Sequence, residues 1–128
     1  MTREDRKYVL VVDDDQWIAQ LVKLHLQQAA YQVILAENGL QALRHLYETP
    51  VDVALVDVYL GEEYGMTLME QLHHAYPELP VIIMTAAATA EVATEARRRG
   101  AAGYMPKPFQ ASELLDHVAE ALTQVSRP

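Results

Sequence analysis

Five short, mostly apolar runs are spaced along the chain, and a segment with a different pattern follows each of them. The runs occupy residues 8–12, 32–36, 52–57, 81–84 and 102–105. Runs of this length that do not alternate with polar residues are typical of strands buried on both faces of a parallel sheet. Pro50 and Gly61 bracket the central run. The pattern therefore predicts five strands, most of them buried.

The segments between the runs predict helices, because their apolar residues recur every three or four positions. We expect helices at about residues 16–29, 38–49, 66–76, 86–99 and 111–125. Their expected inward faces are Ile18, Leu21, Val22, Leu26 and Ala29; Ala42, Leu43, Leu46 and Tyr47; Met66, Met69, Leu72 and Tyr76; Val92; and Leu114, Leu115, Val118, Leu122 and Val125. Strands alternating with helices predict an α/β fold in which helices cover both faces of a parallel sheet.

Some segments are expected to be less firmly held than the rest. Residues 86–99 are rich in alanine, and Val92 is their only large apolar anchor. Residues 59–65 form a polar segment with two glycines, which predicts a loop. The charged residues 1–7 are expected to form a loose tail. Because no linker or repeat interrupts the remainder, we expect residues 1–128 to form one domain, folded from about 8 to 125.

Polar side chains stand at the carboxyl ends of the predicted strands. Asp13, Asp14 and Asp15 follow the first strand, and Asp57 ends the third. Thr85 follows the fourth strand, and Lys107 comes shortly after the fifth. In open α/β sheets this edge is where ligands bind. Carboxylates, a hydroxyl and an ammonium group gathered there predict a metal and phosphoryl site.

Composition excludes several classes of function. The chain of 128 residues is 51% hydrophobic, which suits one compact domain, and its longest apolar runs are far shorter than the ~20 residues of a membrane span. The net charge of −8 argues against direct binding of nucleic acid, whose phosphates it would repel. The chain has no cysteine, which excludes disulfides and thiolate metal sites and agrees with a cytoplasmic location.

Two other groups of charged or titratable residues have simpler explanations than a binding site. Arg97, Arg98 and Arg99 fall at the end of a predicted helix, where cations stabilise the helix dipole, and we interpret them as a solvated helix end. His73 and His74 are adjacent, so they point to different sides of a helix and form a poor metal pair.

Motifs in the right order and spacing resemble the receiver domain of two-component response regulators, the family of the single-domain chemotaxis regulator. The motifs are Leu10-Val-Val-Asp-Asp-Asp15, Asp52-Val-Ala-Leu-Val-Asp57, Gly65-Met66, Pro80-Val-Ile-Ile-Met-Thr85-Ala86 and Gly103-Tyr104…Lys107-Pro108-Phe109. The resemblance covers roughly residues 7–125. It implies a flavodoxin-like three-layer fold, with the five-stranded sheet in the order 2-1-3-4-5.

The resemblance also implies how the site works. Asp57 matches the aspartate that accepts a phosphoryl group from the phosphohistidine of a histidine kinase or phosphotransfer protein. Asp13 and Asp14 match the acidic pair that holds Mg²⁺ together with Asp57, and the backbone carbonyl of Tyr59 matches a further metal ligand. We expect no separate substrate to be turned over: the domain would assist its own phosphorylation and dephosphorylation.

Five further residues match the groups that respond to the phosphoryl group. Lys107 would offset its charge, and the hydroxyl of Thr85 would move towards it. Tyr104 matches the switch aromatic that turns inward when the threonine moves, and Ala86 is small enough to allow a close approach. Lys107-Pro108 matches a peptide bond that is cis in the family. The fourth helix, fifth strand and fifth helix would then repack and control an output domain or effector protein.

Two other classes of protein fit the sequence less well than the receiver domain does. Asp13 and Asp15 form the D-x-D of a haloacid dehalogenase phosphatase, but Gln16 and Trp17 follow where that family has other residues. A flavodoxin-like electron carrier needs a phosphate loop rich in Ser, Thr and Gly, whereas three aspartates would repel phosphate. A receiver-like domain that signals without phosphorylation stays open. So do the cognate kinase, the output, a homodimer on activation, and whether the chain is part of a longer protein.

Overall fold

The computed structural model describes residues 6–125, with side chains described up to Thr123. Arg6 and Lys7 are exposed and outside any helix or strand. The remainder of the predicted tail, residues 1–5, lies outside the described residues, as does the side chain of Val125. None of the helices described is long and apolar enough to cross a membrane.

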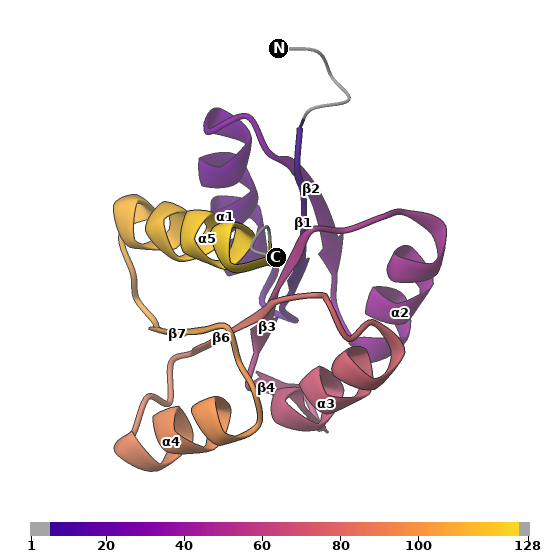
Figure 1. The fold of residues 1–128 in the computed structure, drawn as a ribbon. Coiled ribbons are helices and arrows are strands. Elements are labelled where there is room, and N and C mark those ends of the chain that lie inside the picture. The colour runs from indigo at the N-terminus through magenta and orange to yellow at the C-terminus, as the bar shows by residue number, and fades with distance from the viewer. Residues whose placement is uncertain (1–5, 126–128) are drawn as a thin grey trace.

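A five-stranded parallel sheet forms the centre of the molecule (Figure 1). Its strands are β1 (Tyr8–Val12), β2 (Gln32–Ala36), β3 (Val53–Asp57), β6 (Val81–Thr85) and β7 (Gly103–Pro106). They lie in the order β2-β1-β3-β6-β7, and every neighbouring pair is parallel. This is the order 2-1-3-4-5 that the resemblance implied, and the predicted α/β fold is confirmed.

Five helices cover the two faces of the sheet. They are α1 (Gln16–Gln28), α2 (Gly39–Glu48), α3 (Gly65–Ala75), α4 (Ala90–Arg98) and α5 (Ala111–Val125). Helices α1 and α5 pack on one face, and α2, α3 and α4 pack on the other (Figure 1). β1, β3 and β6 are central and almost wholly buried, which explains their lack of polar alternation.

The helix faces follow the sequence pattern with three corrections. Leu21, Ala29 and Tyr47 were expected to point inward, but all three are exposed. Leu21 lies on the outer side of α1, whose buried face is Ala19, Val22 and Leu26. The spacing of apolar residues predicted the helices correctly, but it assigned some exposed residues to their buried faces.

The start of α4 and the segment after β3 also differ from expectation. α4 begins at Ala90, not at residue 86, because the side chain of Thr89 caps it by accepting a hydrogen bond from the Val92 amide at 3.1 Å. The predicted loop 59–65 contains a short antiparallel hairpin, formed by β4 (Tyr59–Leu60) and β5 (Glu63–Tyr64). Glycine at position 61 has a φ of +60°, which suits the tight turn between these strands.

Candidate functional site: an acidic cluster with one lysine

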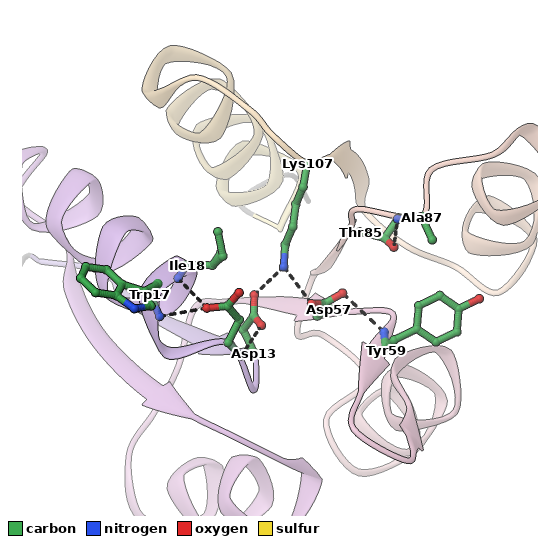
Figure 2. Close-up of polar contacts among 9 residues, drawn as sticks. Asp13, Trp17, Ile18, Asp57, Tyr59, Thr85, Ala87 and Lys107 are labelled. Atoms are coloured by element: carbon green, nitrogen blue, oxygen red, sulfur yellow. Dashed lines mark hydrogen bonds and ion pairs between the residues drawn. The ribbon is translucent and has the colours of Figure 1, made fainter.

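Two buried aspartates and a lysine form the centre of the site (Figure 2). The Lys107 ammonium lies 2.7 Å from Asp13 Oδ2 and 2.8 Å from Asp57 Oδ2, and donates a hydrogen bond to each. The Asp13 side chain is fully buried, and those of Asp57 and Lys107 are about nine-tenths buried. Three distant parts of the sequence therefore supply one charged cluster.

The sheet explains why these side chains meet. Asp13 directly follows β1, and Asp57 is the last residue of its neighbour β3, so both lie at the same edge. Lys107 follows β7, and its amide donates a hydrogen bond to the Thr85 carbonyl at 2.8 Å. The Lys107–Pro108 peptide bond is cis, in agreement with the resemblance. The strand ends and this loop together direct Lys107 towards the aspartates.

The cluster changes the proton affinities of its members. Burial raises the pKa of Asp13 because the charged form loses water, and this outweighs the opposing effect of Lys107 and of the Asp15 amide. Burial acts to lower the pKa of Lys107, but the two carboxylates outweigh it and raise that pKa. Lys107 is therefore held as a cation between two acceptors.

A third carboxylate completes a set that fits a divalent cation. Asp13, Asp14 and Asp57 can each offer an oxygen within 4.8 Å of the others, and Asp14 is exposed to solvent. Hard cations such as Mg²⁺ and Ca²⁺ prefer oxygen ligands of this kind. Asp14 gives the cluster an open side through which an ion could enter, so the residues present fit a divalent metal.

The side chain of Asp15 caps a helix and is not part of the cluster. It caps α1 by accepting hydrogen bonds from the amides of Trp17 and Ile18 at 3.0 and 3.2 Å (Figure 2). In the D-x-D pair of the phosphatase alternative, Asp13 therefore belongs to the cluster while Asp15 caps the helix. This division argues against the phosphatase interpretation. The same cap fixes the backbone amide of Trp17 at the start of α1, and Trp17 itself is 87% exposed.

The backbone after Asp57 is tied to the acidic cluster. The Tyr59 amide points towards Asp57 Oδ1 at 3.4 Å (Figure 2). The Tyr59 side chain is half exposed and packs at an angle against Tyr64, with ring centroids 6.0 Å apart. Tyr59 thus lies next to the cluster; that its backbone carbonyl is a metal ligand, as the resemblance implies, stays a prediction.

The other predicted residues lie around the same edge. Thr85 is buried, and its hydroxyl accepts a hydrogen bond from the Ala87 amide at 3.0 Å. Ala86 and Pro108 are exposed. The hydroxyl of Tyr104 is buried and has no hydrogen-bond partner within the part of the chain that the structure describes, although the residue as a whole is only half buried.

A five-stranded parallel sheet of this order, with an acidic cluster and a lysine at its carboxyl edge, defines the receiver class of signalling domains. Residues 9–119 match the response regulator receiver domain, so the chain belongs to that family.

Relatives agree with this assignment. The chain is 37% identical over 114 residues to the transcriptional regulatory protein ZraR of Klebsiella oxytoca, which covers 89% of this chain and 26% of that protein. It is 36% identical over 118 residues to the DNA-binding transcriptional regulator NtrC of Escherichia coli K12, covering 92% and 25%. The chain thus spans about a quarter of the length of these curated relatives.

Solved structures show the same fold. A CheY-like receiver domain protein from Methanospirillum hungatei superposes with a TM-score of 0.88 at 29% identity, over 94% of this chain and 97% of that one. A response regulator from Burkholderia pseudomallei, solved with a phosphorylated aspartic acid and a calcium ion, gives a TM-score of 0.83 at 27% identity, over 93% and 70%.

Proposed function

We propose that this domain is a phosphorylation-dependent switch whose phosphoryl acceptor is Asp57. The observation that carries the proposal is the position of Asp57 at the end of β3, beside two further aspartates and bonded to Lys107. Membership of the receiver family and the phosphorylated aspartic acid of the Burkholderia relative support it. The proposed donor is the phosphohistidine of a histidine kinase or phosphotransfer protein.

Transfer would proceed by attack of an Asp57 carboxylate oxygen on the phosphorus of the donor. The new P–O bond forms as the P–N bond of the phosphohistidine breaks, and the electron pair returns to the imidazole, which takes up a proton from solvent. Such transfers depend mostly on positioning and on neutralising charge. Lys107 supplies a fixed positive charge 2.8 Å from Oδ2 of the Asp57 carboxylate.

We propose Mg²⁺ as the resident cation, held by Asp13, Asp14, Asp57 and the carbonyl of Tyr59. When bound, it would offset the carboxylate charges that otherwise repel the donor and neutralise charge that develops on the phosphoryl oxygens. Asp13 Oδ1 also accepts a hydrogen bond from the Asp15 amide at 2.9 Å, and this bond fixes the orientation of the buried Asp13 carboxylate.

The response would pass through Thr85 and Tyr104. In this proposal the Thr85 hydroxyl leaves the Ala87 amide for a phosphoryl oxygen, and exposed Ala86 leaves room for that movement. The Tyr104 hydroxyl makes no hydrogen bond to the described protein atoms, so this side chain can change its packing without breaking one. The surface formed by α4, β7 and α5 would then change and act on an output domain or effector protein.

The wider setting follows from the same proposal. The switch would act in the cytoplasm, would not itself bind nucleic acid, and would turn over no separate substrate. Formation of a homodimer on activation stays a prediction.

Binding of beryllofluoride, a stable mimic of an aspartyl phosphate, tests the proposal. We expect Mg²⁺ and beryllofluoride together to change the fluorescence of Trp17, the single tryptophan, which lies two residues from Asp15. The change should saturate, require both components, and disappear in Asp57→Asn. Asp116→Asn, at an exposed position of α5, is the matched control and should behave as wild type. Equal titrations for wild type and Asp57→Asn would contradict the proposed acceptor.

A further inference from the structure

A set of polar contacts joins the hairpin that follows Asp57 to α4. The Tyr64 hydroxyl, on β5, donates a hydrogen bond to Glu95 Oε1 on α4 at 2.7 Å. The other oxygen of Glu95 forms an ion pair with Arg99 at 2.8 Å. Both Glu95 and Arg99 have side chains that are only about one-third exposed, so these contacts are partly shielded from water.

Arg99 extends the set to a third element. Its guanidinium group pairs with Glu70 on α3 at 2.8 Å and also lies 5.8 Å from the centre of the Tyr64 ring. Arg99 is therefore not part of a solvated helix end, as the sequence suggested for it, although Arg97 and Arg98 are exposed. One arginine connects α3, the hairpin and the end of α4.

The other side of the hairpin reaches the phosphoacceptor. Tyr64 is paired with Tyr59 across the two short strands, and the Tyr59 amide points to Asp57. Next to Tyr64, the Glu63 carboxylate accepts a hydrogen bond from the Gly39 amide at the start of α2, at 2.9 Å. Glu63 thus joins the hairpin to α2, and the neighbouring Tyr64 joins it to α4.

Apolar packing holds α4 less firmly than it holds the other helices. Ala96 is the only residue of α4 that is fully buried, and Val92 is partly buried. Segments with few buried apolar contacts open at low free energy. Polar contacts must therefore contribute an unusually large share of the free energy that holds α4 in place.

We propose that Tyr64, Glu95 and Arg99 form a latch that restrains α4 while Asp57 is unphosphorylated. This inference rests on the proposed function and adds a second route from Asp57 to α4, separate from Thr85 and Tyr104. A phosphoryl group on Asp57 would displace the Tyr59 amide from Oδ1, shift the paired Tyr64, and weaken its bond to Glu95. Repacking of α4 would then require the latch to open.

The protonation state of Tyr64 supports a latch that works at physiological pH. Burial, followed by the bond to Glu95, raises the pKa of Tyr64 to about 12. The phenol therefore remains a neutral donor well above pH 7. The free energy that it contributes to folding is present below the unfolded pKa of about 10 and is lost as the pH rises towards 12.

Tyr64→Phe tests the latch because it removes only the hydroxyl and keeps the ring contacts with Tyr59 and Arg99. We expect the amides of residues 90–98 to exchange hydrogen several-fold faster in this variant without any ligand, while those of α5 do not change. We also expect beryllofluoride with Mg²⁺ to bind roughly tenfold more tightly, because binding no longer has to break the hydrogen bond from the Tyr64 hydroxyl to the charged Glu95. Tyr47→Phe is the matched control, because Tyr47 is 87% exposed on α2.

A double-mutant cycle with Glu95→Ala completes the test. Glu95→Ala should tighten beryllofluoride binding by a similar factor, and adding Tyr64→Phe should have little further effect. Unchanged exchange in α4, unchanged or weaker binding, or fully additive effects would overturn the latch. These results are distinct from failure of the proposed function, in which wild type itself would bind no beryllofluoride in the presence of Mg²⁺.

Discussion

Replacing Lys107 by methionine is expected to slow the phosphorylation of Asp57 by at least about a hundredfold. Lys107 places its positive charge within 2.8 Å of both Asp13 and Asp57, in a site where its own side chain is only 10% exposed. A positive charge fixed in a buried site stabilises the charge of the transition state far more than the same group does in water. Removal of one such preorganised group typically lowers the rate about 100- to 1000-fold. Methionine keeps most of the volume and removes the charge.

The rate is measured as the growth of the phosphorylated species by intact mass spectrometry, with acetyl phosphate and Mg²⁺. Lys107→Arg should give an intermediate rate, because it keeps the charge but replaces a compact ammonium by a planar group. Lys23→Met, outside the site on α1, controls for the loss of one lysine. A Lys107→Met rate within threefold of wild type would mean that this charge has no part in the transfer.

Gly65→Ala is expected to lower the free energy of unfolding by about 3 kcal/mol or more. A methyl group on Gly65 would overlap with the backbone carbonyl oxygen of Asp57, and backbone cannot move aside as a flexible side chain can. The hairpin would have to separate from the end of β3, which is where Asp57 and the Tyr59 carbonyl are positioned. Urea unfolding followed by circular dichroism measures the loss.

Gly61→Ala is the matched comparison for this prediction. Position 61 has a φ of +60° but open space around it, with Asp14 Oδ2 the nearest atom at 3.9 Å from an added methyl group. The expected cost is that of a left-handed backbone alone, about 1–2 kcal/mol. Equal losses at the two positions would show that contact with Asp57 is not what requires glycine at position 65.

The fold and the central residues of the site could be predicted because both follow from short-range patterns. Buried parallel strands are apolar throughout, and their carboxyl ends converge, so Asp13, Asp57 and Thr85 could be placed at one edge from sequence position alone. Lys107 follows the fifth strand in the same way. The strand order and the cis bond after Lys107 came from the resemblance, since no local pattern determines them.

The features that could not be predicted are either too short to form a sequence pattern or depend on contacts between distant segments. The hairpin at residues 59–64 consists of two-residue strands, which are too short to produce a periodic pattern. The partners of Arg99 lie on three elements, so a run of arginines at a helix end gave no sign of them. Leu21 and Tyr47 matched an inward stripe but are exposed, because spacing does not show how much of a helix its neighbours cover.

The central claim, that Asp57 accepts a phosphoryl group, is tested most directly by intact mass spectrometry after incubation with acetyl phosphate and Mg²⁺. We predict one added phosphoryl group on the wild-type protein, with no adduct on Asp57→Asn and none when a chelator removes the metal. An adduct of equal yield on Asp57→Asn, or its absence from wild-type protein that binds beryllofluoride and Mg²⁺, would contradict this assignment.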